Sequence, residues 1–313
     1  MTLRYAFRRL LTVVPVALVV LLVSFSLVEL MPGDPAQVLA GESATPDKIQ
    51  KLREQLGLTQ GIVHRFDSYV SRVFRGDFGN SLFSGRSVTA SIKASLQPTL
   101  SLIMVSLVIS TVLSLILGTI AALRKGHLVD RLISAGAAIG LGIPPFVFAF
   151  LLIVPFALNR SWFPATGYVP IGGGIGPWFR TLVLPAIALA VPCIAELARQ
   201  VRGALIDTLE QDYFRTARAT GLGEIAVIGK HGFKNSAVPI VTVLGSQVAR
   251  LLGGVIVVEY VFGIPGFGAL TYNSVLAQDL PLIRAIVIVS ALMVLAVNLL
   301  VDLSYVYFNP KLR

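Results

Sequence analysis

Charged residues are scarce in this sequence of 313 residues. Asp, Glu, Lys and Arg make up 13% of it, whereas an ordinary soluble domain carries about 25%. Hydrophobic residues make up 55% and gather in runs too long for the core helices of a soluble protein. The composition therefore predicts an all-α integral membrane protein, with one transmembrane domain over residues 1–313 in contact with lipid.

Residues that bind metals or perform nucleophilic catalysis are also rare. Cys193 is the only cysteine, which excludes an intrachain disulfide and a cysteine pair for zinc, and we expect it to pack as a small apolar residue. The three histidines form no zinc-binding motif. Before Gly229-Lys230, Glu224 stands where a phosphate-binding loop needs glycine. These absences predict no catalytic residue, no metal site and no cofactor bound by this chain.

Acidic residues are outnumbered, since 26 Lys and Arg against 16 Asp and Glu give a net charge of +10. The basic residues lie between the apolar runs and are not interleaved with aromatic residues, and no motif for nucleic-acid binding is present. We therefore expect no nucleic-acid partner and assign the basic charge to membrane loops.

Six apolar runs are candidates to cross a bilayer. The first has nineteen residues without a charge and would be about 28 Å long, close to the bilayer core of about 30 Å. Because a signal-peptide core is only about 7 to 15 residues long and more spans follow, we predict an uncleaved first span. Pro144-Pro145 in the third run and Pro185 and Pro192 in the fourth predict kinks. The predicted spans are 10–28, 99–123, 132–158, 181–195, 236–258 and 285–301.

The distribution of basic residues predicts that both termini are cytoplasmic. Short loops on the cytoplasmic side of a membrane carry an excess of Lys and Arg. With the N-terminus inside, the short outer segments hold only Arg160, Arg180 and Arg284. The inner segments then hold fourteen basic residues, namely Arg4, Arg8, Arg9, Arg124, Lys125, Arg131, Arg199, Arg202, Arg215, Arg218, Lys230, Lys234, Lys311 and Arg313.

The long extracytoplasmic loop 31–98 contains two predicted helices. Thr45 and Pro46 suit the start of a short amphipathic helix, and Gly57 suits its end. A second stretch, 62–74, places its apolar residues near one side. This second helix either lies at the outer membrane interface or packs against the spans.

The cytoplasmic loop 203–235 is predicted to form a helix-turn-helix. Ala204 to Thr220 has acidic residues early and basic residues late, and Gly221 directly after it suits a left-handed cap. Glu224 then opens a second short helix. The apolar residues around the turn favour insertion into a partner's groove, whereas a solvated connector would account for the charges alone.

Four segments of this chain resemble those of a known family. The run Asp212–Leu222 (DYFRTARATGL) is similar to the EAA loop of importer permeases, in the form found in the peptide and nickel branch. Other similar segments are Met31–Ala36 (MPGDPA), Arg75–Ser81 (RGDFGNS) and Phe262–Gly268 (FGIPGFG). Over nearly its whole length, the chain resembles a B-type permease subunit of the dipeptide, oligopeptide and nickel ABC importers.

This resemblance implies a type I importer in the bacterial inner membrane. The complex would contain this chain, a C-type permease, two cytoplasmic ATPases that bind ATP and magnesium, and an extracytoplasmic binding protein. The chain would translocate peptides and hydrolyse no ATP itself. The residues that the resemblance assigns to ATPase coupling are Arg215, Thr216, Ala217, Arg218, Ala219, Gly221, Leu222, Gly223 and Glu224. Those that it assigns to an outer gate or to binding-protein docking are Ile264, Pro265, Gly266, Phe267 and Gly268.

Three positions depart from the family's pattern. Arg215 and Thr216 stand where the general EAA pattern has Glu and Ala, so the contact with the ATPase need not use a carboxylate. Ser87 stands where proline is expected after Gly85-Arg86, which leaves the local turn of the outer loop open.

Arg250 is the one charge well inside a predicted span, where an arginine costs about 2.5 to 3.5 kcal/mol on insertion scales. It is a candidate pore-lining residue near the solute path. Alternatively, it pairs with an acidic residue such as Glu259 or Asp302, or it extends toward the interface.

Other solutes and other functions stay open at this stage. Nickel chelates or other small solutes would suit the same family. An ion-coupled secondary transporter would normally carry acidic residues within its spans, but here they lie at span ends. An intramembrane enzyme would need a nucleophile and a base, and the sequence offers no such pair.

Overall fold

The computed structural model describes residues 14–26, 36–37, 44–55, 57–212, 214, 223 and 227–308. Over these ranges the chain is built from helices, and extended segments pair only at an isolated bridge between Asn80 and Ser87. The predicted all-α fold class is therefore confirmed.

The chain divides into two compact units. Unit 1 comprises Gln97–Ala269 and the part of the chain from Val294 onward. Unit 2 comprises Leu270–Met293 and the described residues before Gln97. Each unit has an apolar core of its own, so each can be understood from its own packing.

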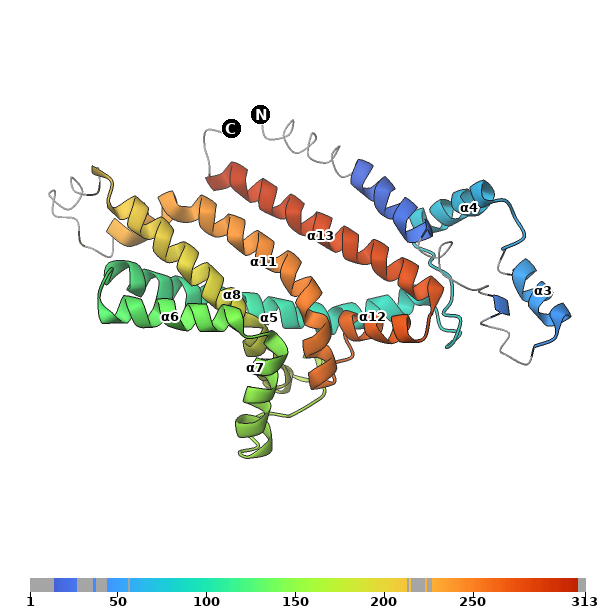
Figure 1. Cartoon of the computed structure of the whole chain (residues 1–313), viewed down its shortest axis with the longest axis horizontal. Coiled ribbons are helices and arrows are strands. Elements are labelled where there is room, and N and C mark those ends of the chain that lie inside the picture. The colour runs from blue at the N-terminus through green and yellow to red at the C-terminus, as the bar shows by residue number, and fades with distance from the viewer. Residues whose placement is uncertain are drawn as a thin grey trace. The chain divides into compact units, whose positions relative to one another are not determined.

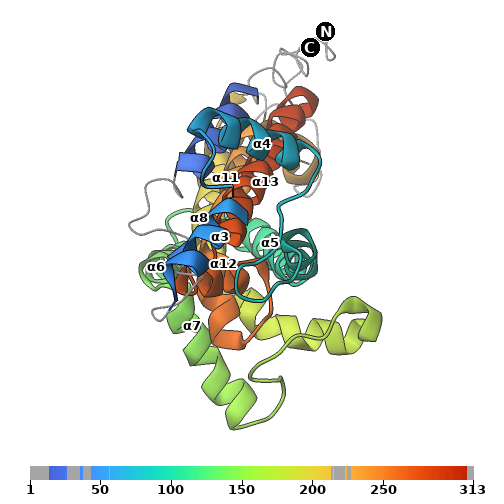
Figure 2. The same ribbon diagram turned by 90° about the vertical axis from the view of Figure 1, so that its right-hand side faces the viewer.

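Helix α8 (Ile175–Leu209) is the central helix of unit 1. It packs against α6 (Leu128–Gly142), α7 (Pro145–Leu152) and α11 (Phe233–Phe262). Figure 1 and Figure 2 show α6, α8 and α11 side by side, with α7 turned away from α6. In α8, 67% of the most apolar stretch is buried, against 28 to 33% in the other long helices. The other helices that the structure describes include Val14–Ser26, α3 (Pro46–Gln55), α4 (Ile62–Phe74), α5 (Val88–Leu123), α12 (Phe267–Leu276), α13 (Leu280–Phe308), the π-helices Ile153–Leu158 and Val227–Gly232, and the 3-10 helix Ile171–Gly173.

Four helices of the described residues are long and apolar enough to cross a bilayer, namely α5, α8, α11 and α13. A fifth candidate is the broken pair formed by α6 and the helix that begins at Pro145. The first predicted span contributes a described helix, Val14–Ser26, while its residues 10–13 and 27–28 lie outside the described part. Helix α8 is 35 residues long where the predicted span is 181–195, because helical structure continues into its polar flanks and through Pro185 and Pro192.

The third predicted span is sharply broken, which confirms the kink predicted at Pro144-Pro145. Helices α6 and α7 are bent by 104° relative to each other. Ile143 has extended backbone angles, as expected of a residue that precedes proline, and Pro145 occupies the first position of α7, where its missing N–H is not needed. The proline pair therefore ends one helix and begins the next.

Unit 2 is held together by an aromatic cluster between α4 and the helix Val14–Ser26. Phe25 contacts Phe66 edge to face at 5.3 Å, and the hydroxyls of Ser24 and Tyr69 share a hydrogen bond of 2.7 Å. Arg284 lies over the rings of Phe25 and Tyr69, each at 5.4 Å. Burial raises the pKa of the Tyr69 hydroxyl above its ordinary value, although the bond to Ser24 and the charge of Arg284 oppose this shift.

The outer loop confirms two local predictions and settles an alternative. Helix α3 begins at Pro46, as predicted, and Gly57 has a left-handed φ of 68°. In α4, Phe66 and Tyr69 contact Phe25 of the helix Val14–Ser26, and Val70 and Val73 pack against the same apolar cluster. The apolar side of α4 therefore packs against a predicted span, although Phe74 at its end is 79% exposed.

Ser87 explains how the loop turns without the proline expected from the resemblance. Its backbone pairs with Asn80 in the isolated bridge, and its hydroxyl accepts a bond from the N–H of Ala90 at 3.4 Å. Ser87 thereby caps the start of α5, a position where serine is among the preferred residues. Ser81 donates to the buried carboxylate of Asp279 at 2.5 Å, which ties the same loop to the start of α13.

Helix α5 comes close to α8 at Gly118. A Cβ atom added there would lie 2.7 Å from the carbonyl oxygen of Ala198 and 2.7 Å from Cβ of Val201. Because real side chains do not approach backbone so closely, glycine is required for this contact. Gly136 on α6 is a useful contrast, because a Cβ there would meet nothing within 4 Å.

We expect Gly118→Ala to destabilise the protein by about 1 to 3 kcal/mol, because the added methyl group must push α5 away from α8. The midpoint of thermal unfolding of the purified protein should fall by several degrees. Gly136→Ala is the matched control and should leave it unchanged. Equal midpoints for the two variants would mean that α5 and α8 are not packed this closely.

Candidate functional site

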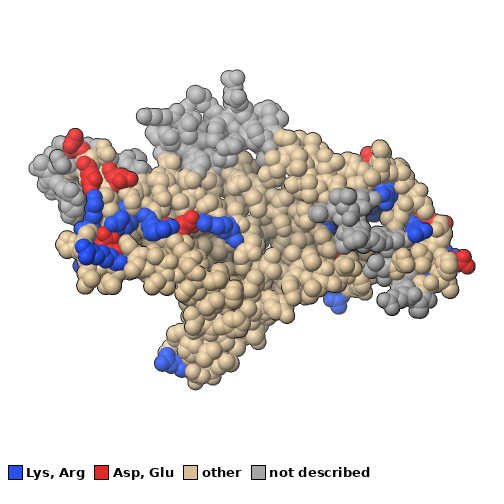
Figure 3. Space-filling model, viewed as in Figure 1, with Lys and Arg blue, Asp and Glu red and all other residues tan. Residues whose placement is uncertain are grey.

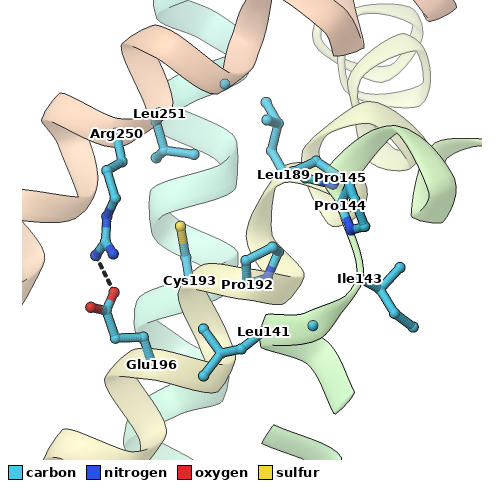
Figure 4. A pocket seen from close by; sticks show the side chains of 12 residues that line it. Leu141, Ile143, Pro144, Pro145, Leu189, Pro192, Cys193, Glu196, Arg250 and Leu251 are labelled. Carbon is cyan, nitrogen blue, oxygen red and sulfur yellow. Dashed lines mark hydrogen bonds and ion pairs between the residues drawn. The ribbon is translucent and has the colours of Figure 1, made fainter. Parts of the chain in front are cut away.

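A cavity of about 290 Å³ lies beside the break between α6 and α7. Figure 4 shows α6, α7, α8 and α11 around it, with a charged pair at one side and apolar side chains on the others. The residues that line it are Leu141, Gly142, Ile143, Pro144, Pro145, Leu189, Pro192, Cys193, Glu196, Arg250, Leu251 and Gly254. Cys193 is buried, as expected from the sequence.

Arg250 forms an ion pair with Glu196 at one side of this cavity. The alternative that Arg250 has an acidic partner is thus confirmed, but the named partner Glu259 is wrong, because its carboxylate is buried in a different network. The side chain of Asp302 lies outside those described. The side chains of Arg250 and Glu196 are 55% and 26% exposed, so the pair contributes about 0 to 1 kcal/mol to stability.

A buried glutamine, Gln247, is hydrogen-bonded to Glu196 of the charged pair. Gln247 has no exposed surface and donates from Nε2 to the carbonyl oxygen of Cys193 at 2.8 Å and to Glu196 at 3.5 Å. Among the described residues, its Oε1 has no hydrogen-bond partner. Gln247 therefore links α11 to α8 and holds Glu196 on the cavity side.

The broken backbone gives the cavity polar groups of its own. The last carbonyl groups of a helix have no partner within that helix, and α6 ends at Gly142 on the cavity wall. Irregular backbone at membrane depth is tolerated where protein buries it or where it lines a water-filled cavity. The break and the cavity therefore form one feature, which can accommodate polar and charged groups of a solute.

The turn after α11 is folded around a second, fully buried carboxylate. Glu259 accepts hydrogen bonds from the hydroxyl of Thr99 at 2.5 Å and from the N–H of Ala269 at 2.9 Å. The Thr99 hydroxyl in turn accepts from the N–H of Phe267 at 2.7 Å. Glu259 and Thr99 thus tie α5, α11 and α12 together at one point.

Glycine is required at several positions of this turn. Gly263 ends α11 with a left-handed φ of 59°, and its N–H and that of Ile264 return to carbonyls of the last turn. A Cβ atom on Gly266 would overlap the Glu259 carboxylate, and one on Gly268 would lie 2.6 Å from Cα of Ile256. The close approach of the chain to Glu259 therefore depends on these residues.

The five residues predicted as an outer gate, Ile264–Gly268, all lie in this turn. Ile264 and Phe267 are 1% and 6% exposed, so the turn is packed into unit 1. Their role as a gate stays a prediction.

The residues predicted to couple to an ATPase fall almost entirely outside the described part of the chain. Gly223 is described and exposed, while Arg215–Leu222 and Glu224 are not described. Of the helix predicted from Ala204 to Thr220, the first part is helical, because Ala204–Leu209 is the end of α8. The prediction of one continuous helix is wrong, because the helix is interrupted at Glu210. There Glu210 forms an exposed ion pair with Lys125 at 2.5 Å.

One buried ion pair was not predicted from the sequence. Arg202 donates to both carboxylate oxygens of Asp130, at 2.5 and 2.8 Å, and Asp130 also accepts from the N–H of Gly126 at 2.9 Å. This pair fixes the turn between α5 and α6 against α8. Since all its bonds lie within the protein, we regard it as structural.

Comparison with known proteins gives full-length matches. A family model described as the binding-protein-dependent transport system inner membrane component matches residues 114–313, and the model of the corresponding N-terminal region matches residues 2–103. The chain is 39% identical over 309 residues to a probable peptide ABC transporter permease protein of Sinorhizobium fredii, and the alignment covers 99% of each chain. It is 38% identical over 311 residues to the glutathione transport system permease protein GsiC of Escherichia coli K12, again over 99% of both.

A solved structure has a similar fold. A chain of the MetNI methionine ABC transporter, in inward-facing conformations, superposes with a TM-score of 0.51 and 18% identity, covering 67% of this chain and 94% of that one. At this identity the likeness concerns the fold alone.

We expect Glu259→Gln to destabilise the protein by about 1 to 3 kcal/mol, because the amide has one acceptor oxygen where both carboxylate oxygens accept hydrogen bonds, from Thr99 and from the N–H of Ala269. Thermal unfolding of the purified protein is the measurement, and the midpoint should fall by several degrees. Glu210→Gln removes an exposed carboxylate and is the matched control, with no change expected. A Glu259→Gln variant as stable as the control would show that the carboxylate does not hold the turn.

Proposed function

The chain belongs to the family of binding-protein-dependent transport system inner membrane components, and on this basis we propose that it imports short peptides across the cytoplasmic membrane. It is a membrane-embedded permease subunit of an ABC transporter, so ATP hydrolysis belongs to partner subunits. The observation that carries the peptide assignment is the identity of 38 to 39%, over 99% of both chains, to permeases named for peptides and for glutathione. Glutathione is itself a tripeptide. Nickel chelates, other small solutes of the same family and ion-coupled transport are the alternatives.

For the complete importer we propose this chain, a C-type permease, two ATPases that bind ATP and magnesium, and an extracytoplasmic binding protein. The six segments predicted from the sequence would be the spans of a single permease domain. Several large apolar side chains support contact with lipid or with the second permease, including Met104, Val108 and Ile139, which are 55 to 63% exposed. Such side chains are stable at the surface only when lipid or protein covers them.

The proposed orientation places both termini in the cytoplasm. Figure 3 shows Lys and Arg side chains of unit 1 gathered at its left end, where Figure 1 places the turn between α5 and α6. Arg124 and Lys125 belong to this turn and Arg131 follows it at the start of α6, and Lys125 reaches Glu210 just beyond α8. The excess of basic residues at this end supports a cytoplasmic location for it.

The mechanism we propose is alternating access controlled through α8 and α11. These two helices continue into the two ends of the predicted loop 203–235, and they carry Glu196 and Arg250, which pair at one side of the cavity. The helical path from Glu196 to Leu209 is about 20 Å long at 1.5 Å per residue. A movement that an ATPase imposes on the loop would therefore change the separation of α8 and α11 and open the cavity to one side or the other.

The coupling residues are the most direct test of this mechanism. Gly221 is predicted to have a positive φ at the end of a helix, where a β-branched residue is strongly disfavoured. Gly221→Val should therefore lower solute uptake per ATP hydrolysed in reconstituted vesicles, or release the ATPase from the complex. The uptake per ATP hydrolysed and the amount of ATPase retained in the complex are measured on the same preparation.

Gly126→Val is the matched control, since Gly126 has a φ of 79° in a different turn of the same proposed face. It should strain the turn between α5 and α6 and lower stability without uncoupling transport. Normal uptake per ATP and normal ATPase retention in Gly221→Val would contradict a coupling role for this loop.

A further inference from the structure

We propose that the cavity at the broken span is a binding subsite for the two charged ends of a short zwitterionic peptide. Arg250 would bind the carboxylate of the peptide, and Glu196 would bind its ammonium group. This inference rests on the proposed function and adds to it the chemical class of the solute and two residues that select it.

The charged pair faces the cavity and lies within reach of a solute. Glu196 and Arg250 extend from α8 and α11 toward each other along one wall, and both side chains are partly exposed. By contrast, in the ion pair of Arg202 with Asp130 the aspartate side chain is only 5% exposed and both of its oxygens accept bonds from Arg202, whose own side chain is 31% exposed. The Arg250 pair can therefore exchange its internal partner for an external one, whereas the Arg202 pair cannot.

Only a zwitterionic solute gives both Arg250 and Glu196 a new partner when their ion pair opens. If only a carboxylate entered, Arg250 would gain a partner while Glu196 lost its own. An ammonium group alone would leave Arg250 without a counterion. A charge without a partner is unfavourable in a partly desolvated site. A solute that carries both charges supplies a partner to each residue, so the pair selects against peptides blocked at either end.

The size and walls of the cavity restrict the remainder of the solute. A volume of about 290 Å³ lies at the lower end of the range for small-molecule sites, which suits a dipeptide or a similarly small solute. Leu141, Ile143, Leu189 and Leu251 supply apolar surface without directional hydrogen bonds. The cavity should therefore recognise the ends of the peptide and accept varied side chains.

The position of Glu196 is fixed before a solute arrives. Gln247 is fully buried, and its Nε2 bonds both to Glu196 and to the carbonyl of Cys193 on the same helix. The C-terminal end of α6, at Gly142, also lies on the cavity wall, and the partial negative charge of a helix C-terminus favours the ammonium group. A preorganised site of this kind loses less conformational freedom when it binds.

The test uses the complete importer in vesicles with three solutes: dialanine, N-acetyl-dialanine and dialanine amide. Uptake efficiency is measured for the wild type, Arg250→Gln, Glu196→Gln and the double variant. For each variant, the uptake efficiency for one solute is divided by that for another. The binding protein is the same in every preparation, so its preference among solutes affects this ratio equally in the wild type and in the variants. That ratio isolates the contribution of the cavity.

We expect Arg250→Gln to reduce the preference for dialanine over its amide by at least about tenfold, because the free carboxylate loses a charged partner. Glu196→Gln should reduce the preference for dialanine over the N-acetyl compound by a similar factor. The double variant has a neutral cavity and should lose both preferences while it still assembles. Arg160→Gln, which removes a charge that lies over Trp162 and away from the cavity, should change neither ratio.

Unchanged ratios in the single variants and in the double variant would overturn the subsite, whether or not the absolute rates fall. A uniform loss of uptake for all three solutes would assign the pair a purely structural role. Failure of the proposed function has a different result, because wild-type vesicles would then take up no peptide with ATP present. That result would contradict both peptide import and the subsite proposed for it.

Discussion

Backbone groups in a bilayer have no water to bond to, and each unsatisfied group costs several kcal/mol. A span can therefore break only where protein or a water-filled cavity receives the freed groups. Pro144 and Pro145 force such a break between α6 and α7, and the cavity lies at that point. Arg250 and Glu196 lie on the same cavity for a similar reason, because charged side chains within a bilayer also need water or a partner.

The charged groups of unit 1 differ in how completely the protein satisfies them. Glu259 is fully buried, and all its described partners belong to the turn after α11 and to Thr99. Asp130 is likewise enclosed by Arg202 and Gly126. These two sites fix the ends of the helices. The pair of Arg250 with Glu196 is partly exposed, so it is the one of the three that a solute can reach. Buried polar contacts at Arg202 in α8 and at Glu259 in α11 thus fix these two helices, whereas the pair of Glu196 and Arg250 between them is accessible to a solute.

Local sequence patterns predicted the fold class, the break at Pro144-Pro145 and helix α3, because each depends on neighbouring residues. Helix α8 was predicted too short, since hydrophobicity identifies the part of a helix that lies in lipid and gives no signal for its polar continuation. The partner of Arg250 was missed because Glu196 lies 54 residues away and nothing local shows which face of α8 meets α11. The role of Glu259 was missed for a similar reason: only the folded turn brings Gly266 against its carboxylate.

If the break between α6 and α7 opens onto a water-filled solute path, a thiol placed on the cavity wall should be accessible to a charged reagent. In a Cys193→Ala background of the assembled importer, Leu141→Cys places a thiol on the cavity wall, and Ile139→Cys places one on α6 away from the cavity. Both native side chains are exposed in the isolated chain, at 38% and 62%. A charged methanethiosulfonate should modify Leu141→Cys rapidly and Ile139→Cys slowly, and dialanine should slow the first reaction. Equal rates at the two positions, with no protection by dialanine, would contradict the account.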